Sequence, residues 1–278
     1  MSKGLLKAKG KSFYWASCLL SKKQAITAAE LYAICRQADD LVDESSSASE
    51  ASKKLILFRD ETLQGSFFQQ AQINKQAFVA LTQGVESDLG VVRIENEAEL
   101  LQYCYQVAGT VGIMMCDVLE VSDPKALQHA VNLGIAMQIT NICRDVVADA
   151  HLGRRYLPAT LVGQISIEDL AQPSKPQIQI VTSALRVLLH LADRYYESGN
   201  EGIVYLPLRA RFGIFLAGRL YRQIGVKLGN RDCNYWERRI SLSIAEKIIV
   251  TLKSLILFVS TPAYWKVFSK PALVSRWK

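Results

Sequence analysis

Two pairs of aspartates, separated by roughly a hundred residues, are the side chains of this sequence whose type and spacing could do chemistry together. Asp39 and Asp43 stand in the string RQADDLVDE, and Asp145 and Asp149 stand in NICRDVVADA. Residues four apart lie one turn apart on one face of a helix, so each pair would place two carboxylates next to each other. Such like charges repel unless a cation lies between them, and Mg2+ binds one or two carboxylates together with substrate phosphates. The spacing therefore predicts an enzyme that ionises diphosphates.

The surroundings of both pairs indicate that the carboxylates face the inside of the protein. Arg36 lies one turn before Asp39 and Arg144 directly precedes Asp145, and an arginine can bind phosphate oxygens through two parallel hydrogen bonds. The flanking residues are mostly aliphatic, and charge in such surroundings is tolerated only when it is paired or metal-bound. A solvated acidic helix surface would explain one pair alone, but two pairs in apolar segments favour a cleft.

Nearly the whole chain shows the periodicity of helices. Apolar residues recur at intervals of three and four, and no segment shows sustained alternation of period two. The pattern predicts helices over residues 25–42, 53–64, 76–89, 97–119, 124–147, 176–198, 210–227 and 244–258. Clusters of Ser, Gly, Pro and Asn separate these segments, and no linker divides the chain. We expect an all-α bundle that forms one domain over residues 1–278.

Length and composition fit a protein with a large core and no need of disulfides. The chain has 278 residues, half of them hydrophobic, and six cysteines without a CxxC motif. Cysteines of this kind are typical of buried reduced thiols, which predicts a cytoplasmic protein. The basic N-terminus is not followed by the apolar core of a signal peptide, so we do not expect export.

The positive charge of the chain could serve an anionic ligand or surface. The net charge is +7, and basic residues are dense between residues 209 and 239. No nucleic-acid-binding motif accompanies them, so nucleic acid is not expected as a partner. The apolar string IIVTLKSLILFVSTPAYWKVF is interrupted by Lys253, and its longest uncharged run is too short to span a bilayer, which takes roughly 20 residues. We interpret it as the last core helix, with peripheral membrane contact as the alternative.

Seven strings, taken in order, resemble the squalene and phytoene synthase family from about Lys11 to Lys247. They are KSFYWASCLL, LYAICRQADDLVDE, YCYQVAGTVGIMM, QITNICRDVVADAHLGRRYLP, ADRYYESGNEGIVYLPLRAR, LYRQIGVKLG and WERRISLS. One string would be weak support, but their order and spacing are specific. Within the family, the IGVK and GRRYLPATL stretches look most like bacterial phytoene synthases and dehydrosqualene synthases.

The resemblance implies the isoprenoid synthase fold, a helical bundle around a central active-site cavity, and head-to-head prenyl transfer. Family members join two identical prenyl diphosphates through a cyclopropylcarbinyl diphosphate and use Mg2+, for which Mn2+ is an alternative. We expect two geranylgeranyl diphosphates to give phytoene in carotenoid biosynthesis. That reaction ends with loss of a proton, so NADPH is not expected. Farnesyl diphosphate as substrate, giving dehydrosqualene or squalene, is the alternative in the same class.

Two hypotheses from other classes stay open at this point. A head-to-tail chain elongase or a terpene cyclase shares the metal chemistry but would not carry NxxRDxxxD and GRRYLP together. A noncatalytic membrane-associated assembly protein is compatible with the basic charge and the apolar C-terminal string. The intact aspartate pairs argue against it.

The family pattern also implies roles for individual residues. Metal ligands are expected at Asp39, Asp40, Asp43, Asn141, Asp145 and Asp149, and catalytic roles at the four paired aspartates, Tyr103 and Arg144. Contacts with substrate or intermediate are expected at Ser12, Phe13, Tyr32, Arg36, Val107, Gly112, Gln138, Asn141, Tyr156, Tyr221, Arg239 and Lys247. Ala148 stands where the family commonly has an acidic residue, and this departure leaves the spaced ligands in place.

Overall fold

The computed structural model describes residues 11–45, 47–121 and 123–266, without the side chains of residues 11 and 12. Within these ranges the named elements are all helical, which confirms the all-α prediction. An isolated bridge pairs Arg93 with Arg155. The elements are α2 (Lys11–Ser17), α3 (Lys22–Asp43), α4 (Ala48–Gln64), α5 (Ser66–Gln70), α6 (Lys75–Glu86), η1 (Ser87–Leu89), α7 (Glu97–Cys104), η2 (Tyr105–Gly109), α8 (Thr110–Val118), α9 (Lys125–His151), α10 (Ala159–Val162), α11 (Ile167–Ala171), α12 (Lys175–Glu201), η3 (Gly202–Tyr205), α13 (Leu208–Gly229), α14 (Ile244–Ser260) and η4 (Pro262–Trp265).

The sequence predicts the long helices well and their interruptions less well. The helix expected over residues 97–119 is broken by η2, a single π-helical turn over Tyr105–Gly109. Turns of this kind are often found at functional sites. The short helices α5, α10 and α11 were not predicted, because five residues or fewer give too little periodicity to detect.

Polar caps fix where several helices begin. The Ser21 side chain accepts a hydrogen bond from Gln24 N before α3, and the Asn74 side chain accepts one from Ala77 N before α6. Ser243 and Glu246 form a reciprocal capping box at the start of α14. These bonds satisfy backbone N–H groups that have no partner within the helix.

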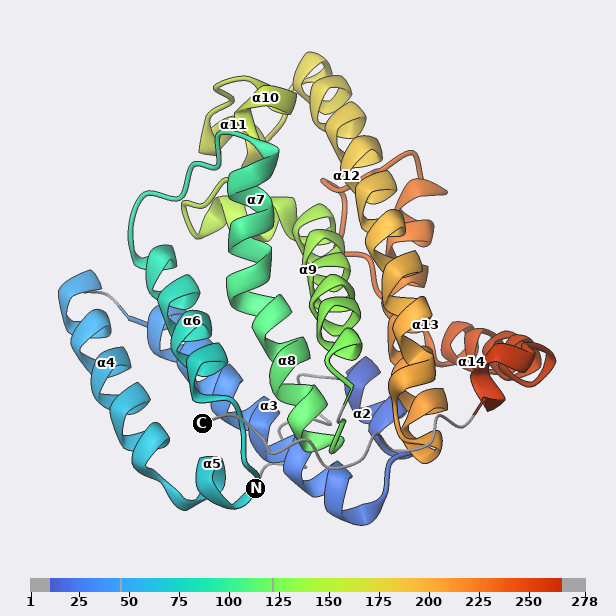
Figure 1. Cartoon of the computed structure of the whole chain (residues 1–278). Helices are drawn as coiled ribbons and strands as arrows, with labels where there is room; N and C mark the ends of the chain where they lie inside the picture. The colour runs from blue at the N-terminus through green and yellow to red at the C-terminus, as the bar shows by residue number, and fades with distance from the viewer. Residues whose placement is uncertain (1–10, 46, 122, 267–278) are drawn as a thin grey trace.

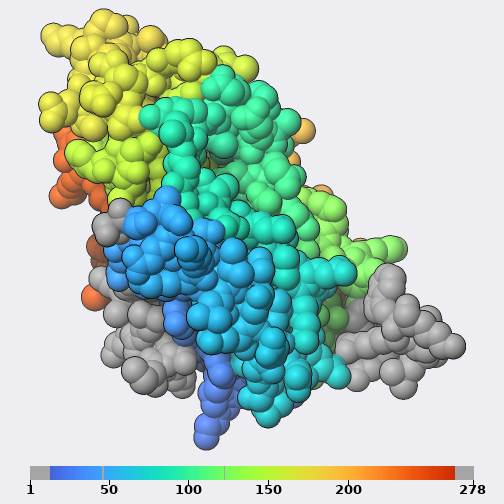
Figure 2. Space-filling model, turned by 90° about the vertical axis from the view of Figure 1, so that its left-hand side faces the viewer, coloured from blue at the N-terminus to red at the C-terminus, as the bar shows by residue number. Residues whose placement is uncertain are grey.

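Helix α9 lies in the middle of the bundle (Figure 1). The connected helices α7 and α8 pack along one side of it, and α12 and α13 along the other. The main core joins α7, α9, α12 and α13, and a second apolar cluster joins α3, α4, α6 and α8. Figure 2 shows the outer surface of the α3–α6 side. The aspartate-bearing helices α3 and α9 thus belong to adjoining clusters.

Glycines let α9 approach α8 and the preceding turn η2 at backbone distance. A Cβ atom placed on Gly112 would lie 2.2 Å from the carbonyl oxygen of Ala130, and one on Gly134 would lie 2.3 Å from that of Ala108. Both distances are far shorter than van der Waals contact. The helix pair therefore depends on glycine at these two positions.

Helix α14 differs from the expectation of a last core helix. Only Val250, Ser254 and Phe258 are buried in it, and most of its large aliphatic side chains are exposed. The interpretation as a core helix is therefore wrong, because packing covers only one side of α14. No helix in the described part of the chain is both long enough and apolar enough to cross a membrane.

The cysteines are free, as expected. Cys104, Cys116, Cys143 and Cys233 are buried. Cys18, however, is exposed, so the expectation of burial is wrong for that thiol.

Replacing Gly134 by alanine should destabilise the fold. The added methyl group has to push against the backbone of Ala108 and Gly109 in η2. Overpacking of this kind lowers the free energy of unfolding by roughly 1–3 kcal/mol. Denaturant unfolding followed by circular dichroism measures the loss. Gly229→Ala is the matched control, since nothing lies within 4 Å of a Cβ there. Equal stability of the two variants would contradict the close helix contact.

Candidate active site

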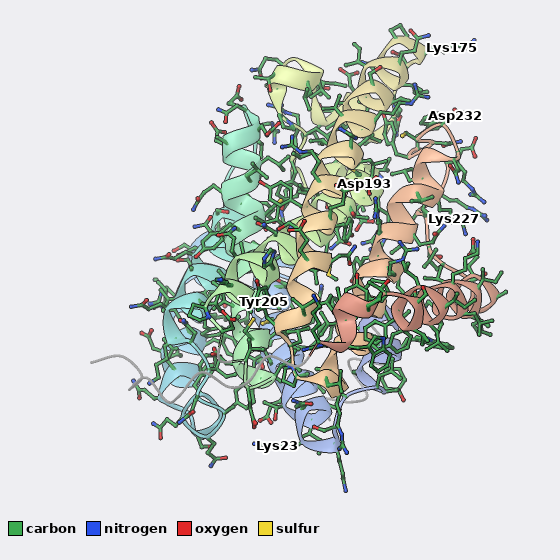
Figure 3. All side chains as sticks on the ribbon, turned by 45° about the vertical axis from the view of Figure 1, so that its right-hand side comes forward. Lys23, Lys175, Asp193, Tyr205, Lys227 and Asp232 are labelled. Atoms are coloured by element: carbon green, nitrogen blue, oxygen red, sulfur yellow. The ribbon has the colours of Figure 1, made fainter. Side chains whose placement is uncertain are left out.

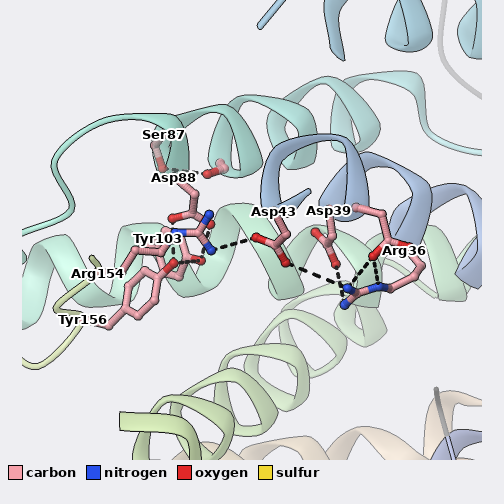
Figure 4. A network of polar contacts seen from close by, with 10 residues as sticks. Arg36, Asp39, Asp43, Ser87, Asp88, Tyr103, Arg154 and Tyr156 are labelled. Carbon is pink, nitrogen blue, oxygen red and sulfur yellow. Dashed lines mark hydrogen bonds and ion pairs between the residues drawn. The ribbon is translucent and has the colours of Figure 1, made fainter. Parts of the chain in front are cut away.

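Arg36 contacts the carboxylates of the first acidic cluster from one side (Figure 4). Its Nε donates to Asp40 Oδ1 at 2.7 Å. Its terminal nitrogens lie 3.9 Å from Asp39 Oδ2 and 3.8 Å from Asp43 Oδ2. All four residues lie on α3 within two turns, so the helix itself sets this arrangement. One guanidinium therefore offsets the repulsion among three carboxylates.

Two arginines hold Asp145 on α9. Arg144 donates to the two carboxylate oxygens at 2.8 and 2.5 Å, and Arg239 donates to them at 2.7 and 2.9 Å. The Asp145 side chain is only 14% exposed, whereas that of Arg239 is 65% exposed. The helix bends at Asp145, where φ is −106° and ψ is 15°. An exposed arginine on a buried carboxylate is well placed to transfer its hydrogen bonds to an incoming anion.

Arg154 connects the two acidic clusters. Its backbone N–H donates to the carbonyl oxygen of Asp149 at 2.9 Å, just beyond the end of α9. Its Nη1 donates to Asp43 Oδ1 on α3 at 2.8 Å, although these residues are 111 positions apart. Figure 4 shows a continuous chain of contacts from Arg36 through Asp43 to Arg154. The structure thus brings the two predicted clusters together.

A buried acid and two tyrosines extend this network. The hydroxyl of Tyr103 lies 2.9 Å from Asp88 Oδ2, and the Tyr156 hydroxyl donates to Asp88 Oδ1 at 2.7 Å. The two hydroxyl oxygens are 3.1 Å apart and the rings stack at 4.7 Å. Burial raises the pKa of Tyr103 well above its usual value, and the negative charge of Asp88 adds to this. Tyr103 therefore keeps its proton and remains a hydrogen-bond donor.

The paired aspartates differ in their proton affinity. Burial raises the pKa of Asp39 to about 7. Burial and the nearby charge of Asp145 raise the pKa of Asp149 to about 8. Burial would also raise the pKa of Asp145, but the hydrogen bonds from Arg144 and Arg239 outweigh it and lower that pKa. Each cluster thus contains a carboxylate of raised pKa that would gain from additional positive charge.

Aromatic side chains adjoin both clusters. The Phe13 ring lies 5.0 Å from Tyr221 and 6.4 Å from Tyr32. Burial raises the pKa of Tyr221 to about 12, and the charges of Arg144 and Asp145 also act on this hydroxyl. Tyr32 has Arg36 and Asp39 among its electrostatic neighbours. The three rings therefore form an apolar wall next to the charged layer.

The other predicted residues lie at varying distances from the aspartates. Asn141 Nδ2 donates to Gln138 Oε1 at 3.3 Å on α9, one turn before Asp145. Val107 lies in η2, and Gly112 lies at the contact of α8 with α9.

Lys247, Ser12 and Ala148 are the remaining positions that the sequence singles out. Lys247 lies in the first turn of α14, outside the helices that carry the aspartates. Ser12 lies in α2, and its side chain is outside the described residues. Ala148 is exposed, so the missing acid leaves the buried network unchanged.

Sequence reasoning missed Asp88 and Arg154. Arg154 lies in the GRRYLP string, directly after the second aspartate pair, and this proximity was a usable signal. Asp88 follows a helix end in an ordinary turn sequence. Its partners are 15 and 68 residues away, and only the fold brings them together.

The donor atoms of the second cluster suit a hard cation, although no preformed cage is present. In the described part of the chain, no three acidic, histidine or cysteine side chains gather closely enough to hold a metal ion. Mg2+ does not require such a cage, since it binds through one or two carboxylates, water and substrate phosphates. Asn141 Oδ1 is buried without a hydrogen-bond partner, one turn before Asp145. An unpartnered amide oxygen next to two carboxylates fits an oxygen-liganded ion.

Comparison with solved structures defines the class of fold. The chain superposes on a dehydrosqualene synthase with a TM-score of 0.82 at 24% identity, covering 94% of this chain and 96% of that one. A squalene synthase from Alicyclobacillus acidocaldarius gives a TM-score of 0.72 at 18% identity, covering 84% and 93% of the two chains. These are helical synthases of the isoprenoid synthase fold, which confirms the expected architecture.

Sequence comparison places the chain within that class. Residues 6–246 match the family model described as squalene/phytoene synthase. The 15-cis-phytoene synthase of Enterobacter agglomerans is 34% identical over 86% of this chain and 88% of its own length. That of Pantoea ananas is 33% identical over 87% and 86%. The chain belongs to the squalene and phytoene synthase family.

Asp149→Asn should stabilise the metal-free protein at alkaline pH. The pKa of Asp149 rises from 3.8 to about 8 on folding, so the folded state keeps a proton that the unfolded chain releases. Its contribution to stability is therefore complete below pH 3.8 and is lost as the pH rises to about 8. The variant removes this loss. Thermal unfolding in EDTA across this range should show a flatter pH dependence and a higher Tm at the alkaline end.

Asp145→Asn is the control variant, for which we expect a change in Tm of the opposite sign. The pKa of Asp145 is lowered, so loss of its charge leaves Arg144 in a mostly buried site without its partner. This variant should unfold at a lower temperature than the wild type at every pH above the range in which Asp145 titrates. Equal Tm changes for the two asparagine variants would contradict the assigned charge environments.

Asp88→Asn should slow catalysis more than it weakens substrate binding. The carboxylate accepts from two tyrosine hydroxyls, and a hydrogen bond to a charged group contributes about 1.5–3 kcal/mol, so kcat should fall roughly tenfold to a hundredfold. If Asp88 acts by orienting Tyr103, the Asp88→Asn/Tyr103→Phe double variant should be no slower than Tyr103→Phe alone. Steady-state kinetics of the three variants measure this, with Ser87→Ala as the neighbouring control. Multiplicative losses would show that the two residues act independently.

Proposed function

We propose that this protein is a phytoene synthase that condenses two geranylgeranyl diphosphates head to head through a cyclopropylcarbinyl diphosphate. The observation that carries the proposal is the convergence of two arginine-bound aspartate clusters from α3 and α9, joined by Arg154. Two acidic clusters and four arginines match the demand of a reaction that loses two diphosphates. The relatives named phytoene synthase, similar over most of their length, support the same substrate class.

Four arginines would bind the diphosphates. Arg36 and Arg154 face the first cluster, and Arg144 and Arg239 face the second. Planar guanidinium groups bind phosphate oxygens in pairs and keep their charge at any physiological pH. We propose that an incoming diphosphate takes over part of the hydrogen bonding that now goes to Asp145. Binding of the diphosphate would thereby be coupled to release of the Asp145 carboxylate from its arginines.

Metal binding would complete the neutralisation of charge. Asp39, Asp40 and Asp43 would serve one diphosphate, and Asn141, Asp145 and Asp149 the other, as oxygen ligands. Bound Mg2+ would supply Lewis-acid stabilisation of the diphosphate as it leaves the allylic carbon. The raised pKa values of Asp39 and Asp149 are consistent with sites that need added positive charge.

The aromatic and tyrosine residues would act on the hydrocarbon part of the reaction. Phe13, Tyr32 and Tyr221 place aromatic faces next to the charged layer, where they can favour a carbocation and exclude water. Tyr103 and Tyr156 present protonated hydroxyls held by Asp88. We propose that the reaction ends with loss of a proton and requires no NADPH.

We also propose the length of the substrate chains and the location of the protein. Twenty-carbon chains are favoured over farnesyl diphosphate by the phytoene synthase relatives, while dehydrosqualene and squalene synthases share the fold. We propose a cytoplasmic protein, acting over residues 1–278 as one catalytic domain, that contacts a membrane peripherally.

Purified protein supplied with Mg2+ and an equal mixture of farnesyl and geranylgeranyl diphosphates should release a forty-carbon conjugated triene without NADPH. Extraction, chromatography and the ultraviolet spectrum identify the product. EDTA should abolish the reaction and Mg2+ should restore it. A thirty-carbon product, or a product that forms only with NADPH, would overturn the proposed substrate or the proposed final step.

Asp39→Asn should lower the rate by about two orders of magnitude or more, since one charged group is lost from the ionisation step. Asp60→Asn on α4 is the matched control, because Asp60 lies outside both clusters in an ion pair with Arg59. Circular dichroism checks that both variants fold. Full activity of folded Asp39→Asn would remove this residue from the proposed site.

A further inference from the structure

One face of α14 is an uncovered strip of large aliphatic side chains. At 3.6 residues per turn, its members fall within an arc of about 120° that contains no charged residue. Ile244 is 72% exposed and Ile256 is 70% exposed. The α14 apolar face is formed by Ile244, Ile248, Leu252, Leu255, Ile256 and Val259.

The opposite side of α14 is firmly attached to the bundle. Thr251 Oγ1 accepts a hydrogen bond from Trp15 Nε1 of α2 at 3.2 Å. Glu246 pairs with Lys227 of α13 at 2.6 Å, and Phe258 packs on Phe215 with ring centres 5.8 Å apart. Figure 3 shows α14 projecting sideways from the bundle below Lys227. These contacts fix the apolar face outward, so its exposure is built into the fold.

The charge and aromatic content around this face suit an anionic bilayer. Glu246 is the single acidic residue of α14, and it is already paired with Lys227. Lys253 is exposed, and Trp265 in η4 is 48% exposed just beyond the helix. The sequence that follows, residues 267–278, has three basic residues and no acidic one. An in-plane amphipathic helix with basic and aromatic neighbours is typical of interfacial membrane binding.

A second copy of the chain is a poorer occupant. Seventeen residues make a helix about 25 Å long, and one face of it about 10 Å wide offers roughly 250 Å2. A stable dimer needs about 800 Å2 from each partner. Insertion into a bilayer interface has no such minimum area, because lipid surrounds the strip on every side.

The position of α14 also relates it to the candidate active site. Its partner helix α2 carries Trp15, which bonds to Thr251, and Phe13, which lies against Tyr32 and Tyr221. A single short helix thus separates the exposed apolar face from the aromatic wall. Long prenyl chains would have a short apolar path between the two.

We propose that the α14 apolar face is a docking surface that seats the protein on an anionic bilayer and presents the α2 side of the active site to it. The benefit of membrane docking rests on the proposed function, because the substrate chains and the product of that reaction are lipids. The docking itself depends only on α14 and its surroundings.

Sedimentation of the full chain with vesicles tests the docking surface. The wild type should bind vesicles of phosphatidylcholine and phosphatidylglycerol, and more weakly those of phosphatidylcholine alone. Leu252→Glu/Ile256→Glu should reduce the partition coefficient roughly a hundredfold or more, because two apolar side chains no longer leave water. Ile180→Glu/Val187→Glu on α12 is the matched control, since both residues are similarly exposed on another helix. This control should bind like the wild type.

Two further measurements keep docking and catalysis distinct. In detergent micelles with dispersed substrate, the α14 variant should form product at the wild-type rate. If the wild type forms product in micelles but does not bind vesicles, the docking surface is overturned and the proposed function stands. If the wild type binds vesicles but forms no product, the proposed function is overturned and the docking surface stands. Docking is also overturned if the α14 variant binds vesicles like the wild type. The same holds if the wild type does not bind vesicles and light scattering shows that it forms a dimer, which the α14 variant does not form.

Discussion

The structure depends on holding several partly buried carboxylates close together without a net repulsion that would open the bundle. Asp39, Asp43, Asp145 and Asp149 come from two helices that belong to adjoining apolar clusters. In such surroundings an unpaired carboxylate is costly, and the charged form is retained only next to a cation. Arg36, Arg144, Arg154 and Arg239 supply that cation from four different positions in the chain.

The arginines that stabilise the metal-free protein are also the groups that a diphosphate would need. Asp145 is nearly buried, while one of its two arginines is mostly exposed. An anion that arrives from solvent therefore meets Arg239 first. Each hydrogen bond that Arg239 donates to the anion instead of to Asp145 leaves the charge of Asp145 less well neutralised. The carboxylate then needs a new cation. Substrate and metal binding are thus expected to be mutually dependent, which follows from charge balance alone.

Much of the fold and of the charged layer could be predicted from the sequence. The aspartate spacing is a local property of one helix, and periodicity identifies α3 and α9 to within a few residues. Contacts that depend on folding could not be found in this way. Asp88 meets Tyr156 across 68 residues, and no spacing rule connects them.

Helix α14 shows another limit of sequence reasoning. Periodicity shows that a helix is amphipathic or apolar, but the same pattern is produced by a core helix and by a helix covered on one side only. The outcome is decided by how many neighbours the fold supplies. Here α13 packs against α14 and Trp15 of α2 bonds to Thr251, while Ile256 stays in solvent.

Charged and apolar surfaces lie on different sides of the candidate active site. The diphosphates would be held by a polar layer on α3 and α9, whereas Phe13 of α2 and Tyr221 of α13 form an aromatic wall beside that layer. A hydrocarbon product has lost both charged groups, so the arginines no longer bind it and its remaining contacts are with the apolar side. Its release is then favoured toward another apolar phase, since transfer to water costs about 25 cal/mol for each Å2 exposed. The loss of charge that drives the chemistry would therefore also determine the side on which the product leaves.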